Sequence, residues 1–293
     1  MAALEERLRE AGARVNAALD LLLPQPQGPE AALMEAMRYA ALGPGKRLRP
    51  FLTLEAGALF DAEEGALLRA ACAVELVHAY SLVHDDLPCM DNDDFRRGLP
   101  TVHKKFGEAA AVLAGDALLT FAFEVLADPA AHRDPQMRGI LIAALAKAAG
   151  PSGMVAGQMI DMAGAEQDMA TIARMNRLKT GALIAFAVDA GALIGCARDD
   201  QRQALARFAQ DVGAAFQMTD DILDVQSSPE AMGKAVGKDA ARGKINYVTL
   251  LGLEGATERV RLLAAQAKRH LAMFGPRAQT LMDTVDFMLD RRG

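Results

Sequence analysis

The stretch EGALLRAACAVELVHAYSLVHDD, residues 64–86, decides the fold class. Its apolar residues recur at steps of three and four, which places one set on a single buried face of an α-helix: Leu67, Ala70, Ala71, Val74, Val77 and Leu82. Similar helical patterns continue along the chain, which is rich in alanine and leucine and has no convincing alternation of apolar and polar residues. We therefore predict an all-α protein, a single-domain bundle of about ten helices over residues 1–293.

A cluster of carboxylates follows at the end of this helix, within ten residues: Asp85, Asp86, Asp91, Asp93 and Asp94. Carboxylates this close repel one another, so a fold tolerates them either on a solvated surface or around a cation. Pro88 removes a backbone donor, and we expect the helix to end there and Asp91 to fold back over its end. The C-terminal end of a helix is also the negative end of its dipole, which favours a bound cation over bare carboxylates.

A second acidic cluster lies in AFQMTDDILD, residues 215–224. At 3.6 residues per turn, one helical face carries an amide and three carboxylates: Gln217, Asp220, Asp221 and Asp224. One such segment could simply face water. Two of them, each next to an apolar helix, favour a shared site for divalent cations, and oxygen ligands of this kind suit Mg²⁺.

Basic residues concentrate in the loops near these clusters: Lys46, Arg47, Arg49, Arg96, Arg97, Lys179, Lys234, Lys238 and Lys244. Carboxylate-bound Mg²⁺ and such cations together hold phosphate oxygens. The loop GPGKRLRP lacks the glycine spacing and the Ser or Thr of a P-loop, and DNDDFRRG lacks the glycine and glutamate of an EF-hand. The sequence indicates a metal-bridged diphosphate that is not a nucleotide. An acidic solvated loop and a purely structural helical scaffold are the alternatives.

The bulk composition excludes several classes of protein. The chain has 293 residues, 52% of them hydrophobic, and a net charge of -6, which offers no basic field for nucleic acid or an anionic membrane. Cys72, Cys89 and Cys196 are isolated, so neither a zinc site nor a disulfide framework is indicated. The N-terminal segment lacks a signal-peptide core, and the apolar segment 181–197 is short for a bilayer span and carries Asp189. We expect a cytoplasmic protein with no nucleic-acid partner and no membrane span.

These motifs together resemble the trans-isoprenyl diphosphate synthases, all-α enzymes with two aspartate-rich motifs facing each other across a central cavity. DDLPCMD resembles the first motif with two extra residues, and DDILD resembles the second. GKRLRP, VHAYSLVHDD, RRG, KTG, FQ and GK are similar to the family's other signatures in order, from residue 43 to about residue 252. The resemblance implies the isoprenoid synthase fold, a single polyprenyl synthetase domain and a homodimer.

The resemblance also assigns site residues. It implies that several Mg²⁺ ions bind to six aspartates: Asp85, Asp86, Asp91, Asp220, Asp221 and Asp224. The allylic diphosphate would contact Arg96, Lys179 and Lys234, and the isopentenyl diphosphate would contact Lys46, Arg49, His78 and Arg97. Lys244 resembles a late lysine at the mouth of the site. The dipoles that steady the carbocation would come from Gln217 and from the backbone at Lys179 and Thr180.

Two local interpretations depend on this resemblance. A lone histidine on an apolar helix, such as His78, is often a satisfied core group, and only the family pattern makes it a ligand. The methionines of GMVAGQMIDM, namely Met154, Met159 and Met162, are interpreted as core packing rather than as a cofactor site.

Product length depends on the floor of the tunnel below the first motif. Tyr80 lies about 7.5 Å below Asp85 along the helix axis, and Ser81 lies more directly beneath it. An aromatic residue at this place, with the two-residue insertion, resembles the bacterial enzymes that make (2E,6E)-farnesyl diphosphate (geranyltranstransferases). The motif DDLPCMDND also resembles geranylgeranyl diphosphate synthases, which are the alternative. A class I terpene cyclase and a non-catalytic prenyltransferase subunit are weaker alternatives, because both acidic motifs are complete.

Overall fold

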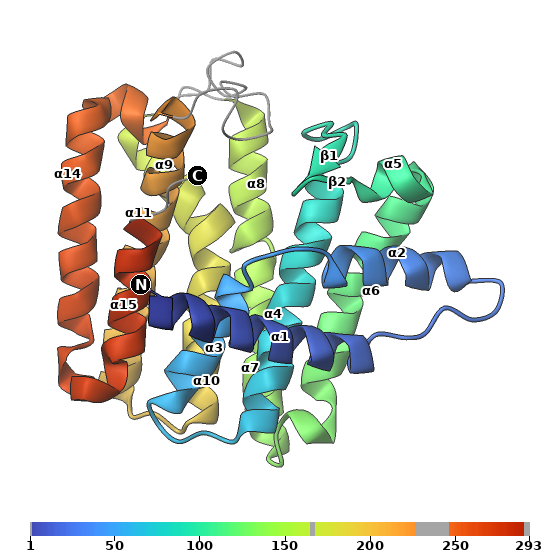
Figure 1. The fold of residues 1–293 in the computed structure, drawn as a ribbon, viewed down its shortest axis with the longest axis horizontal. Coiled ribbons are helices and arrows are strands. Elements are labelled where there is room, and N and C mark those ends of the chain that lie inside the picture. The colour runs from blue at the N-terminus through green and yellow to red at the C-terminus, as the bar shows by residue number, and fades with distance from the viewer. Residues whose placement is uncertain (1, 165–167, 227–245, 290–293) are drawn as a thin grey trace.

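The computed structural model describes residues 2–164, 168–226 and 246–289, which form a bundle of helices (Figure 1). The helices are α1 (Ala2–Leu22), α2 (Ala31–Leu42), α3 (Leu48–Ala58), α4 (Glu64–Asp85), α5 (Val102–Phe106), α6 (Glu108–Ala127), α7 (Pro135–Ala149), α8 (Met154–Ala163), α9 (Met169–Asn176), α10 (Ala182–Ile194), α11 (Asp199–Gln226), α14 (Tyr247–His270) and α15 (Gln279–Leu289). Three short helical turns join them: η1 (Pro129–Ala131), η2 (Arg177–Gly181) and η3 (Ala272–Ala278). The prediction of an all-α bundle is confirmed.

The helix α4 lies in the middle of the bundle and packs against α1, α2, α3, α6, α7 and α10. In Figure 1 the longer helices run side by side, whereas α1 and α2 cross them at a steep angle. One cluster of buried apolar side chains reaches from Leu4 in α1 to Met288 in α15. A smaller cluster, which includes Ile172 and Met218, joins α9, α11 and α14.

Burial along α4 goes beyond the single apolar face that the sequence predicted. Cys72, Ala73 and Leu76 lie off that face and are also fully buried. A helix with neighbours on most of its sides leaves little surface to solvent, and its small residues let those neighbours approach closely. Periodicity therefore identified the helix correctly but underestimated how much of it is buried.

The ends of α4 follow from local chemistry. At its start the Glu63 carboxylate accepts hydrogen bonds from the backbone N–H groups of Gly65 and Ala66, at 2.9 and 2.7 Å. At its end the helix stops at Asp85, before Pro88, and the N–H of Asp91 donates to the carbonyl of Asp85 at 2.8 Å. The predicted helix end and the return of Asp91 over it are both confirmed.

The loop after α4 closes with a hairpin that the sequence analysis did not predict. Strands β1 (Phe95–Arg96) and β2 (Leu99–Pro100) pair in antiparallel fashion. The two residues between them, Arg97 and Gly98, both have positive φ, 53° and 79°, as a tight hairpin turn requires. Strands of two residues are too short to show a period, so only the fold reveals them.

Two findings bear on the expectation that no segment spans a membrane. The segment 181–197 forms the buried core helix α10, as predicted. Three other stretches are nevertheless long and apolar enough to cross a membrane by length and composition: Glu64–Asp85, Glu108–Ala127 and Pro135–Ala163. The protein itself buries 72% of the apolar window in the first, 39% in the second and 28% in the third. The last two thus expose apolar surface.

The close contact between α3 and α10 gives a prediction about stability. A Cβ atom at Gly191 would overlap the carbonyl oxygen of Thr53 and the backbone nitrogen of Gly57, so Gly191→Ala forces the two helices apart. We expect a loss of about 1–3 kcal/mol in the free energy of unfolding, measured by denaturant titration. The matched control is Gly139→Ala in α7, where nothing lies within 4 Å. An equal effect of both variants on stability would contradict this view of the packing.

Candidate active site

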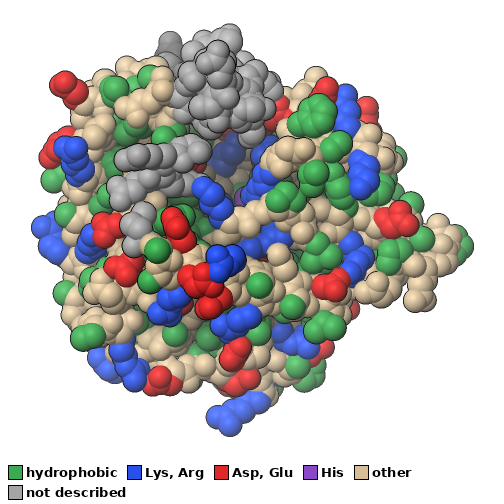
Figure 2. Space-filling model, viewed as in Figure 1, with side chains coloured by type: hydrophobic (Ala, Val, Ile, Leu, Met, Phe, Trp, Pro, Cys, Tyr) green, Lys and Arg blue, Asp and Glu red, His purple; other side chains and the backbone are tan. Residues whose placement is uncertain are grey.

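A cavity of about 910 Å³ opens between α1, α3, α4, α11 and α15. Its walls include all four residues predicted to hold isopentenyl diphosphate: Lys46, Arg49, His78 and Arg97. Thr180, Gln217 and Asp220 line the same space from the π-helical turn η2 and from α11. In Figure 2 several Lys and Arg side chains gather in the upper middle of the face that α1 crosses. The cavity thus combines a cationic wall with one end of the second acidic cluster.

A second cavity, of about 460 Å³, lies on the other side of Arg49, His78 and Thr180, which line both spaces. Asp85 and Lys179 line it, and so do Tyr80 and Ser81 beside mostly apolar side chains. Because the two cavities share walls, the acidic clusters at Asp85 and Asp220 open onto adjoining spaces. The sequence predicted this convergence.

The second cavity also corrects an interpretation made from the sequence. Met154 is buried, as expected of core packing. Met159 and Met162, however, are 65% and 49% exposed, and both line this cavity on α8. The helical spacing could not distinguish a core face from the wall of a cavity, since both are apolar. The methionine side chain adapts to ligands of varied shape, which suits a wall that contacts a hydrocarbon.

The first acidic cluster divides into two environments. Burial, followed by the charge of Asp91, raises the pKa of Asp85 from 3.8 to about 6, although Lys179 opposes the shift. The Asp86 carboxylate is buried and accepts from Arg96, with distances of 2.6 Å to Nη2 and 2.8 Å to Nε. Asp86 and Arg96 were predicted to contact metal and diphosphate, respectively, but here each holds the other. Asp85 is therefore the carboxylate of this pair that faces the cavity.

The second acidic cluster shows the same division. Both oxygens of the buried Asp221 accept hydrogen bonds, one from Gln217 Nε2 at 3.1 Å and one from the N–H of Tyr247 at 3.0 Å. Thr180 Oγ1 in turn donates to Gln217 Oε1 at 3.2 Å. This chain of bonds ties η2, α11 and the start of α14 together. Asp221 thus orients Gln217, while Asp220 lines the larger cavity and Asp224 is exposed.

The donor set fits Mg²⁺ in kind. Carboxylate oxygens are the ligands that this ion prefers, and the raised pKa of Asp85 marks negative charge that a cation would compensate. Within residues 2–164, 168–226 and 246–289, no three His, Cys, Asp or Glu side chains already stand close enough to hold an ion. The carboxylates that would hold the ion belong to two clusters, at Asp85 and Asp220, which line adjoining cavities.

Of the three lysines that were predicted to lie at the allylic diphosphate or at the mouth of the site, Lys179 is the one within the described residues. Lys179 Nζ donates to Asp161 Oδ2 on α8 at 2.7 Å. Asp161 was missed from the sequence, where GQMIDM was interpreted only through its methionines. Its position three residues after Gln158, on one helical face, was the available signal. Lys234 and Lys244 lie outside the described residues.

The backbone at Lys179 and Thr180 has an unusual form. Residues Arg177–Gly181 make a π-helical turn between α9 and α10. Gly157 of α8 packs so closely on this turn that a Cβ atom there would overlap the backbone nitrogen of Lys179. Single π turns often occur at functional sites, because they shift side chains and leave carbonyl groups outside the regular ladder. The sequence carried no signal for this turn.

The cationic wall is poised for an anion. Nε of Arg49 is buried and has no hydrogen-bond partner among the described groups. Burial, followed by the positive charges of Arg49 and Arg97, holds the pKa of His78 well below its usual value of 6.5. His78 is therefore neutral at pH 7 and can donate one N–H without adding charge. A diphosphate would satisfy the unpaired guanidinium nitrogen and the surrounding cations together.

The fold and the cavities define a class: all-helical proteins in which two acidic helical segments and a set of cations enclose a site for diphosphates. Comparison with known families agrees, because residues 30–274 match the family described as Polyprenyl synthetase. The chain belongs to this family.

Individual relatives extend the comparison. The chain is 46% identical over 271 residues to a farnesyl diphosphate synthase of Geobacillus stearothermophilus, covering 92% of this chain and 91% of the relative. It is 45% identical over 245 residues to a chloroplastic geranylgeranyl pyrophosphate synthase of Catharanthus roseus, covering 83% and 69%. Among solved structures, an apo FPP/GFPP synthase from Zymomonas mobilis superposes with a TM-score of 0.89 at 43% identity, covering 98% of this chain and 99% of that one.

The raised pKa of Asp85 gives a prediction for the metal-free protein. Since the folded state binds this proton more tightly than the unfolded state, stability falls as pH rises from about 4 to about 6. Asp85→Asn should therefore raise the free energy of unfolding by about 3 kcal/mol at pH 8, since the pKa rises from 3.8 to about 6 and each pKa unit corresponds to about 1.4 kcal/mol.

The gain should shrink toward pH 4, and urea titrations at several pH values in the presence of a chelator would measure it. Glu35→Gln, at an exposed site on α2, is the matched control and should change stability little at any pH. A gain from Asp85→Asn that does not vary with pH would contradict the assignment.

Proposed function

We propose that this chain is a short-chain prenyltransferase that makes (2E,6E)-farnesyl diphosphate. It would condense isopentenyl diphosphate first with dimethylallyl diphosphate and then with geranyl diphosphate. The observation that carries the proposal is the pair of adjoining cavities, one with a cationic wall and one mostly apolar, with Asp85 and Asp220 opening onto them. Membership of the polyprenyl synthetase family supports the same chemistry.

The proposed role of each residue follows from the cavity that it lines. Lys46, Arg49, His78 and Arg97 bind the diphosphate of isopentenyl diphosphate in the larger cavity. Bound Mg²⁺ supplies Lewis-acid stabilisation of the charge that develops on the departing allylic diphosphate. Its proposed ligands are the carboxylates of the two clusters, led by Asp85 and Asp220.

The remaining residues act on the allylic substrate and the reacting carbons. Lys179 moves from Asp161 to the allylic diphosphate, and Arg96, Lys234 and Lys244 belong to the same proposal. Thr180 lines both cavities and is hydrogen-bonded to Gln217, which lines the larger one, so the dipoles of both residues can stabilise the carbocation.

Product length is the finer part of the proposal. The ring of Tyr80 packs edge-to-face on His84, with centroids 5.8 Å apart, and lines the apolar cavity with Ser81. A ring fixed in this way limits the room for a growing chain. The 46% identity to a farnesyl diphosphate synthase supports the fifteen-carbon product, whereas the 45% identity to a geranylgeranyl pyrophosphate synthase keeps the twenty-carbon product as the second candidate.

We also propose that two copies form a homodimer. Apolar side chains on α6 and α7 are exposed, with Val112 at 41%, Leu113 at 56% and Ile140 at 41%. Helices α6 and α7 pack on each other, and exposed apolar side chains on neighbouring helices can form an interaction face. A second copy of the chain would cover it, so that these helices face protein rather than lipid.

The remaining parts of the proposal concern organisation and location. The apolar cluster that joins α1 to α15 supports a single domain over residues 1–293. We propose that the enzyme works in the cytoplasm, where its free cysteines stay reduced.

A product assay tests the proposed reaction. Purified protein with Mg²⁺, isopentenyl diphosphate and dimethylallyl diphosphate should give farnesyl diphosphate as the main product, and a chelator should abolish turnover. Asp220→Asn should lower kcat by about 10²-fold or more, the usual cost of losing one charge-stabilising group. The exposed Asp199→Asn, at the start of the same helix α11, is the matched control and should be close to wild type. Absence of any condensation product with Mg²⁺ would overturn the proposal.

The role of Tyr80 predicts a change of product. Tyr80→Ala removes the ring from the end of the apolar cavity, so we expect a twenty-carbon or longer product, identified by chromatography after dephosphorylation. Tyr80→Phe keeps the ring and should keep the fifteen-carbon product. If Tyr80→Ala still stops at fifteen carbons with wild-type kcat, another residue forms the floor.

A further inference from the structure

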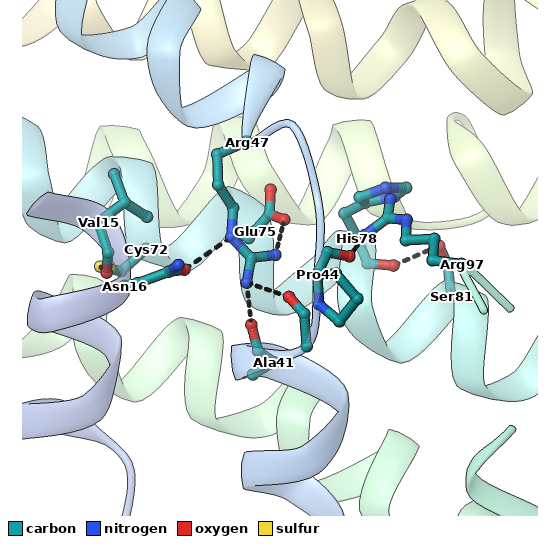
Figure 3. A network of polar contacts seen from close by, with 11 residues as sticks. Val15, Asn16, Ala41, Pro44, Arg47, Cys72, Glu75, His78, Ser81 and Arg97 are labelled. Carbon is teal, nitrogen blue, oxygen red and sulfur yellow. Dashed lines mark hydrogen bonds and ion pairs between the residues drawn. The ribbon is translucent and has the colours of Figure 1, made fainter. Parts of the chain in front are cut away.

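We propose that Arg47 and Glu75 form a buried positioning pair that holds the isopentenyl diphosphate site in its binding geometry. From the sequence, Glu75 had no assigned role and Arg47 was named only among the loop cations expected to hold phosphate, and the inference rests on the proposed function of Lys46, Arg49, His78 and Arg97. Figure 3 shows Arg47 between Asn16, Ala41 and Glu75, with His78 and Arg97 beyond Pro44.

All three nitrogens of the Arg47 guanidinium donate to protein oxygens. Nη1 contacts Glu75 Oε1 on α4 at 2.6 Å, and Nε contacts Asn16 Oδ1 on α1 at 2.8 Å. Nη2 contacts the carbonyls of Ala41 and Gly43, at the end of α2, at 2.8 and 2.7 Å. The Arg47 and Glu75 side chains are only 3% and 4% exposed. Arg47 therefore acts on its own chain rather than on the substrate.

The backbone of the loop depends on these bonds. Arg47 has φ 48° and ψ 37°, a left-handed conformation that a side chain normally avoids, immediately before α3 begins. Such a conformation persists only where the surroundings enforce it, and it sets the directions of Lys46 before it and Arg49 after it. The four bonds of the guanidinium are the groups that enforce it here.

The pair also joins the loop to the rest of the cationic wall. Arg97 Nη1 donates to the carbonyl of Pro44 at 2.6 Å. Gly45 packs against both guanidinium groups, since a Cβ atom there would overlap that of Arg97 and press on that of Arg47. Glu75 lies three residues before His78, one turn away on the same side of α4. The buried Glu75 carboxylate therefore connects the Arg47 loop to the helix that carries His78.

Charge balance gives Glu75 a second role. Without substrate, Arg47, Arg49 and Arg97 repel one another, and the Glu75 carboxylate is a buried negative charge that favours the protonated forms of Arg49 and Arg97. It keeps the cations together while no diphosphate is bound. A merely structural ion pair would not explain this placement, because apolar residues often stabilise a core as well as a buried pair does.

The test uses three variants of the full chain. Arg47→Lys keeps the charge but loses the fork of donors, and Glu75→Gln keeps the shape but loses the charge. The double variant Arg47→Met with Glu75→Leu removes the pair without leaving an unpaired buried charge, so it should fold. Steady-state kinetics would give KM for isopentenyl diphosphate, KM for geranyl diphosphate and kcat, and thermal melting would give Tm.

We expect all three variants to raise KM for isopentenyl diphosphate by about tenfold or more, since a misplacement of about 1 Å in binding groups can cost 10²-fold. KM for geranyl diphosphate should stay near wild type, and the double variant should keep its Tm. Arg202→Lys is the matched control, because its bidentate pair with Asp189 at 3.0 Å also joins two helices, about 22 Å along α11 from Gln217.

The variant Arg49→Gln tests the proposed function of the site independently of the positioning role of Arg47 and Glu75. If it leaves KM for isopentenyl diphosphate unchanged, the assignment of the site is wrong. If it raises that KM while the pair variants lower only Tm, or change both KM values equally, the site stands and the positioning role is overturned. Failure of the double variant to fold would also overturn it, since the pair would then be a folding element.

Discussion

The concentration of like charges at the ends of apolar helices is the constraint on which the rest of this structure depends. Asp85 stands where the central helix α4 ends, and burial beside Asp91 raises its pKa to about 6. The wall of the larger cavity carries three arginines, Arg47, Arg49 and Arg97. A fold does not keep such groups together for stability, because each cluster costs free energy until an opposite charge arrives.

The protein limits this cost with ion pairs between helices. Asp86 pairs with Arg96, Lys179 with Asp161, and Arg47 with Glu75. The side chains of Asp86 and Glu75 are each only 4% exposed, so these two ion pairs are lasting contacts of the fold. Lys179 lines the apolar cavity, and in the proposed function a diphosphate would replace Asp161 as its partner. Part of the charge is thus fixed in the scaffold and part is available to a substrate.

The apolar cavity follows from the same architecture. The central helix α4 carries Tyr80 and Ser81 beneath its own terminal carboxylate, Asp85, while α8 supplies methionines to the same cavity. The polar end and the apolar end are therefore parts of one continuous site. In the proposed reaction, ionisation and product length would depend on the same helix, because Asp85 and Tyr80 are little more than one turn apart.

The sequence by itself determined what local patterns can carry. Helical periodicity, the stop at Pro88 and the four-residue spacing of Asp220 and Asp224 depend on neighbours within a turn or two, so the helices and both acidic segments were predictable. The order of the motifs also indicated the family. Exposure of Met159 to a cavity, the burial of α4 beyond its apolar face and the π turn at Lys179 were not predictable, because the local spacing of the residues would be the same without them.

Only the tertiary structure decided which charges face each other. The partners Arg47 and Glu75 are separated by 28 residues, and Lys179 and Asp161 by 18. No spacing rule links residues that far apart, since the chain between them can take many paths. The distinction between Asp85, which faces the cavity, and Asp86, which is held by Arg96, likewise depends on where the hairpin folds back. The residue types were present in the sequence, and packing assigned their partners.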